Sequence, residues 1–347
     1  MRKFCLIVAK VILPLAIVGW LLWNIPPQEM KVLRSTDKNW WLLAAGFVLS
    51  FAALINTFSR WHILVRCLGL PFRFTDALRL GFLGFLLNFV SAGTVGGDLF
   101  RAVFVAREQP SRRPEAVASV FIDRLIGLYA LFVVTCLATA ALDWHTITPA
   151  VRNISTLTYW VTGTMTLGVI SLSFSTTTHG ALAVWARGLP KVGATIGRLF
   201  DAVGVYRQRR VVVLWAFFQS MLTHLLFAAS IYCLANGLFA QTPSAIEHLI
   251  IVPLSMVAGA MPFTPAGLGV FELAMEKLYQ FIPASGTPIP GVVVALAFRL
   301  VTVAMASLGV IQMWSGRADL ERIKAEAEAM QAKKAVPSVA AEEGVID

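Results

Sequence analysis

The sequence predicts an all-α polytopic membrane protein, and three properties of the chain support this fold class. Of its 347 residues, 57% are hydrophobic and only 14% are charged, and the mean hydropathy is +0.73. A soluble domain carries about 25% charged residues. Several apolar stretches are about 20 residues long, which is enough for a helix to cross a bilayer core. The net charge of +10 is typical of basic cytoplasmic loops in such proteins.

The sequence carries no motif typical of a metal site, a nucleotide site or a hydrolase. Cys5, Cys67, Cys136 and Cys233 lack metal-ligand or CxxC spacing, and three of them lie in apolar runs. Walker, HExxH and GxSxG motifs do not occur. We therefore expect no metal, no other cofactor and no nucleic-acid partner.

The first half of the predicted membrane domain contains three spans. They are Phe4–Trp23, Trp40–Phe58 and Val117–Leu142. No small-x-small cleavage site follows the first run, so we interpret it as a retained span with the N-terminus inside, rather than as a signal peptide. The stretch from Arg60 to Arg79 is rich in arginine, which predicts a cytoplasmic loop.

A glycine-rich break interrupts the apolar chain between the second and third spans. The helix that leads to it, Leu80–Val90, has about 11 residues and rises only about 16 Å, which is too short to cross. The break covers Gly93–Gly97, and Asp98–Val105 continues toward another group of arginines. Because arginines on both sides favour the cytoplasm, we predict a re-entrant hairpin that enters and leaves on that side.

The second half contains three further predicted spans and a second broken segment. The spans are Tyr159–Phe174, Val211–Leu234 and Gly291–Trp314. The short apolar helix Leu249–Met261 leads into a stretch rich in proline and glycine, after which a helix resumes over Val270–Phe281. The preceding loop has no lysine or arginine, so this second hairpin is predicted to enter from outside.

Two further segments lie outside the predicted spans. Over residues 181–206, apolar residues recur at three- and four-residue steps among basic ones, which is typical of an amphipathic helix on an anionic membrane surface. An ordinary core-facing helix is the alternative. Residues 317–347 are charged and alanine-rich, and we expect a cytoplasmic tail that is first helical and then disordered.

Residues 1–316 thus form one predicted membrane domain with two halves, about 1–142 and 159–316. Each half reads span, span, hairpin, span, and the halves begin on opposite sides of the membrane. The predicted architecture is six transmembrane helices plus two re-entrant broken-helix hairpins in an inverted repeat. In transporters built this way, binding sites form from broken helices near the membrane midplane.

Acidic and basic residues recur at equivalent places in the two halves. Arg124 follows Asp98, and Arg299 follows Glu272, at nearly the same spacing. An unpaired charge in a bilayer costs several kcal/mol, which predicts the ion pairs Asp98–Arg124 and Glu272–Arg299. Glu276 lies one turn after Glu272 and shares its helix face. One interpretation is that these pairs only stabilise the fold.

The other interpretation is that the same residues bind a lipid headgroup. Arginine presents a planar fork of donors to phosphate, half-helix N-termini add free N–H groups, and glycine permits close approach to the backbone. The acids could hold a cationic group or carry a proton, and no residue is predicted to be catalytic. The candidate substrate-binding residues are Asn88, Gly96, Gly97, Asp98, Arg101, Asp123, Arg124, Pro265, Gly267, Gly269, Glu272, Glu276 and Arg299.

These motifs resemble those of a known family of membrane proteins. The chain is similar, over about residues 5–315, to the lysylphosphatidylglycerol synthase transmembrane-region family, also called flippase-like membrane proteins. The resemblance implies translocation of a polar lipid. It does not imply synthesis, because the soluble aminoacyl-transferase domain of the best-known relatives has no counterpart in this sequence. The matching residues are Asn88, Gly96-Gly97-Asp98, Arg101, Asp123-Arg124, Gly127, Pro262, Pro265, Gly267, Gly269, Glu272 and Arg299.

We therefore expect a lipid flippase of the cytoplasmic membrane, with both termini inside, rather than an enzyme. Its partners would be membrane lipids: an anionic or aminoacylated phospholipid, or a glycolipid or hopanoid. A separate lipid-synthesis enzyme is a further expected partner. Two alternatives stay open. One is a membrane-embedded transferase acting on a lipid-linked sugar, with Asp98 or Glu272 as its base. The other is a non-catalytic accessory subunit of a lipid-synthesis pathway.

Overall fold

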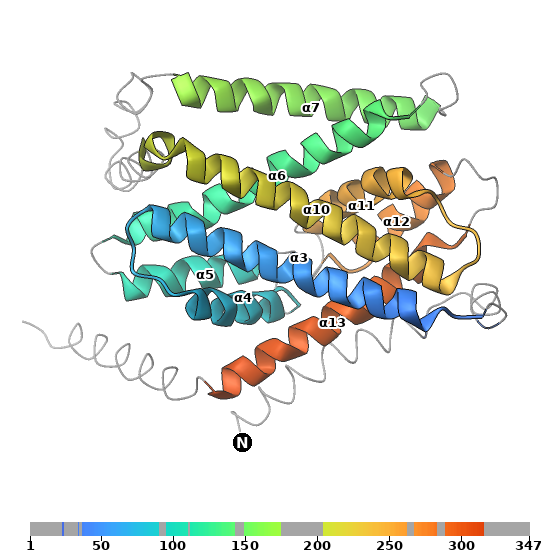
Figure 1. Cartoon of the computed structure of the whole chain (residues 1–347), viewed down its shortest axis with the longest axis horizontal. Helices are drawn as coiled ribbons and strands as arrows, with labels where there is room; N and C mark the ends of the chain where they lie inside the picture. Colours follow the sequence, from blue (N-terminus) through green and yellow to red (C-terminus); the bar gives the residue numbers. More distant parts are fainter. Residues whose placement is uncertain are drawn as a thin grey trace, which may run out of the picture.

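The protein consists of long and short helices packed side by side, as the computed structural model in Figure 1 shows. The structure describes residues 23, 34, 37–89, 95–109, 112–142, 149–174, 204–261, 267–282 and 289–315. These residues form nine main α-helices and contain no β-strand. The predicted all-α fold is therefore confirmed for this part of the chain.

Four of the nine helices are long and apolar enough to cross a membrane. These four are α3, α6, α10 and α13, the last of them over Gly291–Gly309. Four of the six predicted spans coincide with them. The helix bounds are α3 Trp40–Cys67, α4 Phe74–Asn88, α5 Val95–Glu108, α6 Arg113–Ala140, α7 Pro149–Phe174, α10 Arg210–Leu238, α11 Ala245–Ala260, α12 Val270–Phe281 and α13 Gly291–Ser315.

The remaining predicted elements either agree only in part with the structure or lie outside the described residues. The predicted span Tyr159–Phe174 lies within α7, which begins earlier, at Pro149, and is not among the four spanning candidates. The predicted span Phe4–Trp23 lies outside the described residues except for Trp23. The amphipathic helix over 181–206 also lies outside them except for its last three residues, and so does the tail from 317 to 347.

α3 extends further than the sequence predicts. The predicted span ends at Phe58, whereas the helix continues to Cys67 and includes Arg60, which the sequence analysis assigned to a cytoplasmic loop. Trp61 and Leu64 are almost completely buried. The extension follows from this burial, because the extra turns add apolar surface to the core.

α4 also begins within the predicted loop. It starts at Phe74 rather than Leu80, so Arg79 is helical. The backbone N–H of Arg73 donates to Asp76 Oδ2 at 2.9 Å. This contact satisfies an N–H at the helix start and explains why the helix begins earlier than its apolar run.

α3 and α10 lie along one another at the centre of the protein (Figure 1). The Asn39 N–H donates to the Gly237 carbonyl at 3.0 Å, and further along the helices Ser50 Oγ lies 2.6 Å from Ser230 Oγ. Because residue numbers rise along α3 as they fall along α10, the two helices are antiparallel. This contact joins the first half of the chain to the second.

The short helices form two pairs. α4 packs on α5, and α11 packs on α12. Figure 1 shows the first pair beside one end of α3 and α10, and the second pair beside the other end. α5 also contacts α6, and α12 contacts α13. α7 packs against α6 at the edge of the protein.

Each pair of short helices belongs to its own apolar core. One core is built mainly from α10, α11, α12 and α13, and another from α3, α4, α5 and α6. Tyr206, just before α10, belongs to the second of these cores, and its hydroxyl donates to the Leu64 carbonyl at 2.9 Å. Burial raises the pKa of Tyr206. This hydrogen bond links the segment just before α10 to the last turns of α3.

Candidate functional site

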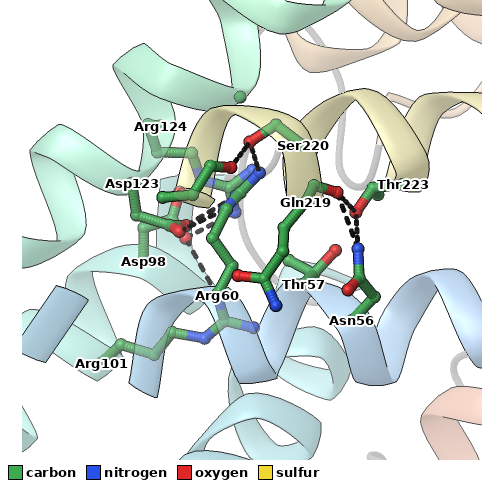
Figure 2. Close-up of polar contacts among 12 residues, drawn as sticks. Asn56, Thr57, Arg60, Asp98, Arg101, Asp123, Arg124, Gln219, Ser220 and Thr223 are labelled. Carbon is green, nitrogen blue, oxygen red and sulfur yellow. Dashed lines mark hydrogen bonds and ion pairs between the residues drawn. The ribbon is translucent and has the colours of Figure 1, made fainter. Parts of the chain in front are cut away.

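A buried ion pair joins α3 to α6. Arg60 Nε lies 2.7 Å from Asp123 Oδ1, and Arg60 Nη2 lies 3.0 Å from Asp123 Oδ2, so the contact is bidentate. Arg60 Nη1 also donates to Ser220 Oγ of α10 at 2.6 Å. Figure 2 shows Arg60 at the centre of these contacts. Both carboxylate oxygens of Asp123, a predicted substrate-binding residue, contact Arg60.

Small and polar residues surround the Arg60 guanidinium. A Cβ added to Gly127 would lie 3.4 Å from Arg60 Nη1, so glycine leaves room for the group. His224 Nε2 lies 3.0 Å from the Gly127 carbonyl. Asn56 Nδ2 donates to Thr223 Oγ1 at 2.8 Å (Figure 2). The polar contacts therefore run through the middle of α3, α6 and α10.

The predicted pair between Asp98 and Arg124 forms beside the Arg60 pair. Asp98 Oδ1 lies 2.5 Å from Arg124 Nη2 and 3.8 Å from Arg101 Nη1. The side chain of Arg124 is 47% exposed, whereas that of Arg101 is only 5% exposed. One carboxylate therefore lies between two guanidinium groups, and one of those groups is open to the surroundings (Figure 2).

Arg101 is held in an aromatic and backbone environment. Its guanidinium carbon lies 5.2 Å from the centroid of the Phe58 ring and 5.4 Å from that of Trp61, which is cation–π geometry. Its Nη2 donates to the Gly81 carbonyl at 3.2 Å. Its Nε is buried and has no hydrogen-bond partner in the described part of the chain. A Cβ on Gly84 would lie only 2.9 Å from that Nε.

The glycines before Asp98 lie in a helix rather than in the predicted break. The sequence analysis placed Gly96 and Gly97 in a break, but α5 begins at Val95, so both are in its first turn. A Cβ on Gly97 would overlap the Gly84 carbonyl oxygen of α4. The Gly97 N–H donates to Asn88 Oδ1 at 2.8 Å, which places Asn88 at the junction of the two helices. Gly97 therefore permits close helix packing.

The second predicted pair also forms. Arg299 Nε and Nη2 lie 2.9 and 2.7 Å from Glu272 Oε1. Glu272 Oε2 accepts a hydrogen bond from the Gly269 N–H at 2.7 Å, so the same carboxylate caps the start of α12. The Arg299 guanidinium carbon lies 5.6 Å from the centroid of the Phe271 ring. Both carboxylate and guanidinium are almost buried.

Two glycines shape the turn before α12. Gly267 has φ of +68° and Gly269 has φ of +82°, a left-handed conformation that side chains disfavour. A Cβ on Gly267 would in addition overlap the Gly259 carbonyl oxygen of α11. The predicted turn glycines are therefore confirmed here, although Pro265 lies outside the described residues.

Glu276 is separate from the Glu272 pair. Its Oε2 accepts from the Val292 N–H in the first turn of α13 at 3.0 Å, and its Oε1 accepts from Gln280 Nε2 at 2.6 Å. The shared helix face thus does not produce a shared site. Glu276 instead caps the start of α13.

Sequence reasoning missed two residues of this site, Arg60 and Ser220. Arg60 was assigned to a loop because it begins a series of arginines. The signal against that assignment is the sequence Trp61 to Val65, which continues the apolar pattern of the helix beyond Arg60. No group of three or more metal-ligating side chains occurs among the residues that the structure describes.

Together, four spanning helices and ion pairs buried between helices define a polytopic membrane protein. A comparison with family models identifies the family of this membrane protein. The model for the lysylphosphatidylglycerol synthase TM region matches residues 7–309, and the chain belongs to this family. Membership indicates a membrane protein of lipid metabolism or transport. No curated protein and no solved structure matches the chain.

Proposed function

We propose that this protein is a polar-lipid translocase of the cytoplasmic membrane and not an enzyme. Its cargo would be an anionic or aminoacylated phospholipid, or a related glycolipid or hopanoid, supplied by a separate lipid-synthesis enzyme. The observation that carries the proposal is the pair of matching ion pairs, Asp98–Arg124 and Glu272–Arg299. Family membership supports the link to lipids.

The two pairs have the same construction. In each, an acid in the first turn of a short helix contacts an arginine on the next long helix, and the separations are 26 and 27 residues. A helix start attracts negative charge. Arginine binds phosphate through a planar fork of donors. A lipid phosphate could therefore exchange with the acid at the arginine while it passes.

The proposed architecture is an inverted repeat of six spans and two re-entrant hairpins, with both termini in the cytoplasm. The helix contacts support the repeat: when α3–α6 are exchanged with α10–α13, the contact of α4 with α13 becomes that of α11 with α6. The four short helices have 12 to 16 residues, so they rise about 18–24 Å, less than a bilayer core.

The test is lipid movement by the purified protein in liposomes. Labelled anionic or aminoacylated lipid should cross between leaflets, and Glu272→Gln and Arg124→Ala should abolish this movement. Arg112→Gln is the matched control, because Arg112 contacts Glu115 in a more exposed pair at the start of α6, at 3.6 Å. Unchanged movement in both site variants would refute the proposed site. Turnover of a sugar donor would favour a transferase instead.

A further inference from the structure

The residues around the two matching acids differ in charge. Arg101 stands three residues after Asp98, whereas Met275 stands three residues after Glu272. Arg101 and Met275 are both buried, so each occupies the interior beside its acid. The first half therefore has a positive charge at a place where the second half has an apolar side chain.

The residues before the two matching arginines differ as well. Asp123 precedes Arg124, whereas Phe298 precedes Arg299. Asp123 is neutralised by Arg60 through the bidentate contact described above. The extra acid of the first half thus comes with an extra arginine, and this added pair contributes no net charge.

The charged side chains around Asp98 and Asp123 do not balance. The first-half cluster consists of Arg60, Asp98, Arg101, Asp123 and Arg124. Its three arginines and two aspartates leave one positive charge in excess. The Glu272–Arg299 pair in the second half is neutral. The two halves therefore offer different electrostatic environments to a headgroup.

The excess charge lies around Asp98. That carboxylate lies 2.5 Å from Arg124 and 3.8 Å from Arg101, so two guanidinium groups share one negative charge. Arg101 Nε is buried without a hydrogen-bond partner in the described residues. Arg124 is 47% exposed and can be reached. An anion at Arg124 would restore neutrality, whereas a cation would add to the excess, and both aspartates of the cluster are already paired.

We infer that the first-half cluster selects a phosphodiester lipid whose headgroup has a net negative charge, with the phosphate bound at Arg124. Zwitterionic and cationic aminoacylated lipids are disfavoured at this place. The inference rests on the proposed function, which leaves the charge of the cargo open. Arg101 acts as a positioning residue, because its buried charge raises the positive potential at Arg124 without contact with the lipid.

Binding to the full-length protein in detergent tests this inference. The probes are short-chain phosphatidylglycerol, phosphatidylcholine and lysyl-phosphatidylglycerol, and the readout is the shift in melting temperature with lipid concentration. We expect phosphatidylglycerol to bind about tenfold more tightly than the other two. Equal binding of all three lipids would overturn the inference.

Charge variants separate this selectivity from non-specific lipid binding. Arg101→Gln removes the excess charge and should abolish the preference. Asp98→Asn raises the excess and should strengthen it, so the inference stays testable if Arg101→Gln does not fold. The matched control is Arg112→Gln, which removes the same charge from the more exposed pair with Glu115, outside the cluster, and should keep the preference. A preference unchanged in both Arg101→Gln and Asp98→Asn would refute the inference.

The two proposals can fail separately. If the protein binds anionic lipid selectively but moves no lipid in liposomes, translocation is refuted and charge selectivity stands. If it moves all three lipids but binds them equally, translocation stands and charge selectivity is refuted.

Discussion

Single residues in this protein are organised by the need to neutralise buried charge. Arg60 is 4% exposed and Asp123 is 2% exposed, and each is the other's ionic partner. Removing one member of a buried pair leaves the other charged and unsolvated, which is more harmful than removing both. The Arg60–Asp123 pair is therefore expected to be essential for stability although it carries no excess charge.

Asp123→Asn should lower the free energy of unfolding by about 3–5 kcal/mol, because Arg60 would remain buried without its counter-charge. The double variant Arg60→Met/Asp123→Leu should recover most of this loss. Denaturant unfolding in detergent, followed by circular dichroism, measures both effects. Equal loss in the single and the double variant would show that packing, not charge, dominates at this position.

The sequence predicted both matching ion pairs but not the Arg60 pair. Asp98 and Arg124 are 26 residues apart, and Glu272 and Arg299 are 27 residues apart, so the recurrence of one spacing indicates both pairs. The contact of Arg60 with Asp123 depends on where α3 ends, and that depends on burial in the tertiary structure. The apolar run Trp61–Val65 indicates the longer helix, but the local pattern does not show which residue of α6 Arg60 contacts.

At the scale of elements, glycines determine how closely the short helices approach. Gly97 of α5 lies against the Gly84 carbonyl of α4, and Gly267 lies against the Gly259 carbonyl of α11. Association of helices within a membrane relies on such close packing rather than on the hydrophobic effect. The short helices of each pair are thus held together by backbone proximity.

Gly97→Ala should destabilise the protein by about 1–3 kcal/mol, because the added methyl group would force α4 away from α5. Gly163→Ala in α7 is the control, since a Cβ there meets no atom within 4 Å and alanine favours a helix. Thermal unfolding of the two variants in the same detergent makes the comparison. The explanation is wrong if both variants melt at the same temperature.

Gly267→Ala should be more harmful than Gly269→Ala. Both residues have positive φ, which costs about 1–2 kcal/mol for alanine, but only Gly267 also abuts a carbonyl oxygen of α11. The difference in unfolding free energy between the two variants measures the contribution of the close contact with α11. Identical values would mean that conformation alone requires glycine at both positions.

Helix existence was predictable here, whereas several helix ends were not. The predicted bounds of α12 agree with the structure at both ends. α4 begins earlier than predicted because of the contact between Arg73 and Asp76. α5 begins before the predicted end of the glycine break, because Gly97 packs against α4 and both glycines tolerate helical geometry. A glycine in a sequence can indicate either a turn or a close approach of two helices, and the sequence alone does not show which.

At the scale of the whole molecule, α3 and α10 define two ends of the protein. The end of α3 and the start of α10 meet where Tyr206 bonds to Leu64, and the opposite ends meet where Asn39 bonds to Gly237. Since both helices are long enough to cross a membrane, we expect these two places to lie at opposite membrane surfaces.

Cysteine labelling should reveal this arrangement. In a cysteine-free background, Arg73→Cys and Gln208→Cys should react with an impermeant maleimide from one side only, and Gln241→Cys from the other side only. All three positions are exposed. Inverted and right-side-out vesicles provide the two orientations. Labelling of Gln208→Cys and Gln241→Cys from the same side would contradict the antiparallel crossing of α3 and α10.

The position of Arg60 in the chain has a consequence for biogenesis. Its counter-charge, Asp123, is synthesised 63 residues later, and the Ser220 hydroxyl comes 160 residues later. A ribosome therefore delivers an arginine to the membrane well before the groups that neutralise it, and an unpaired arginine inside a bilayer is costly. We therefore expect α3 to stay in the translocon or beside an insertase until α6 has been synthesised.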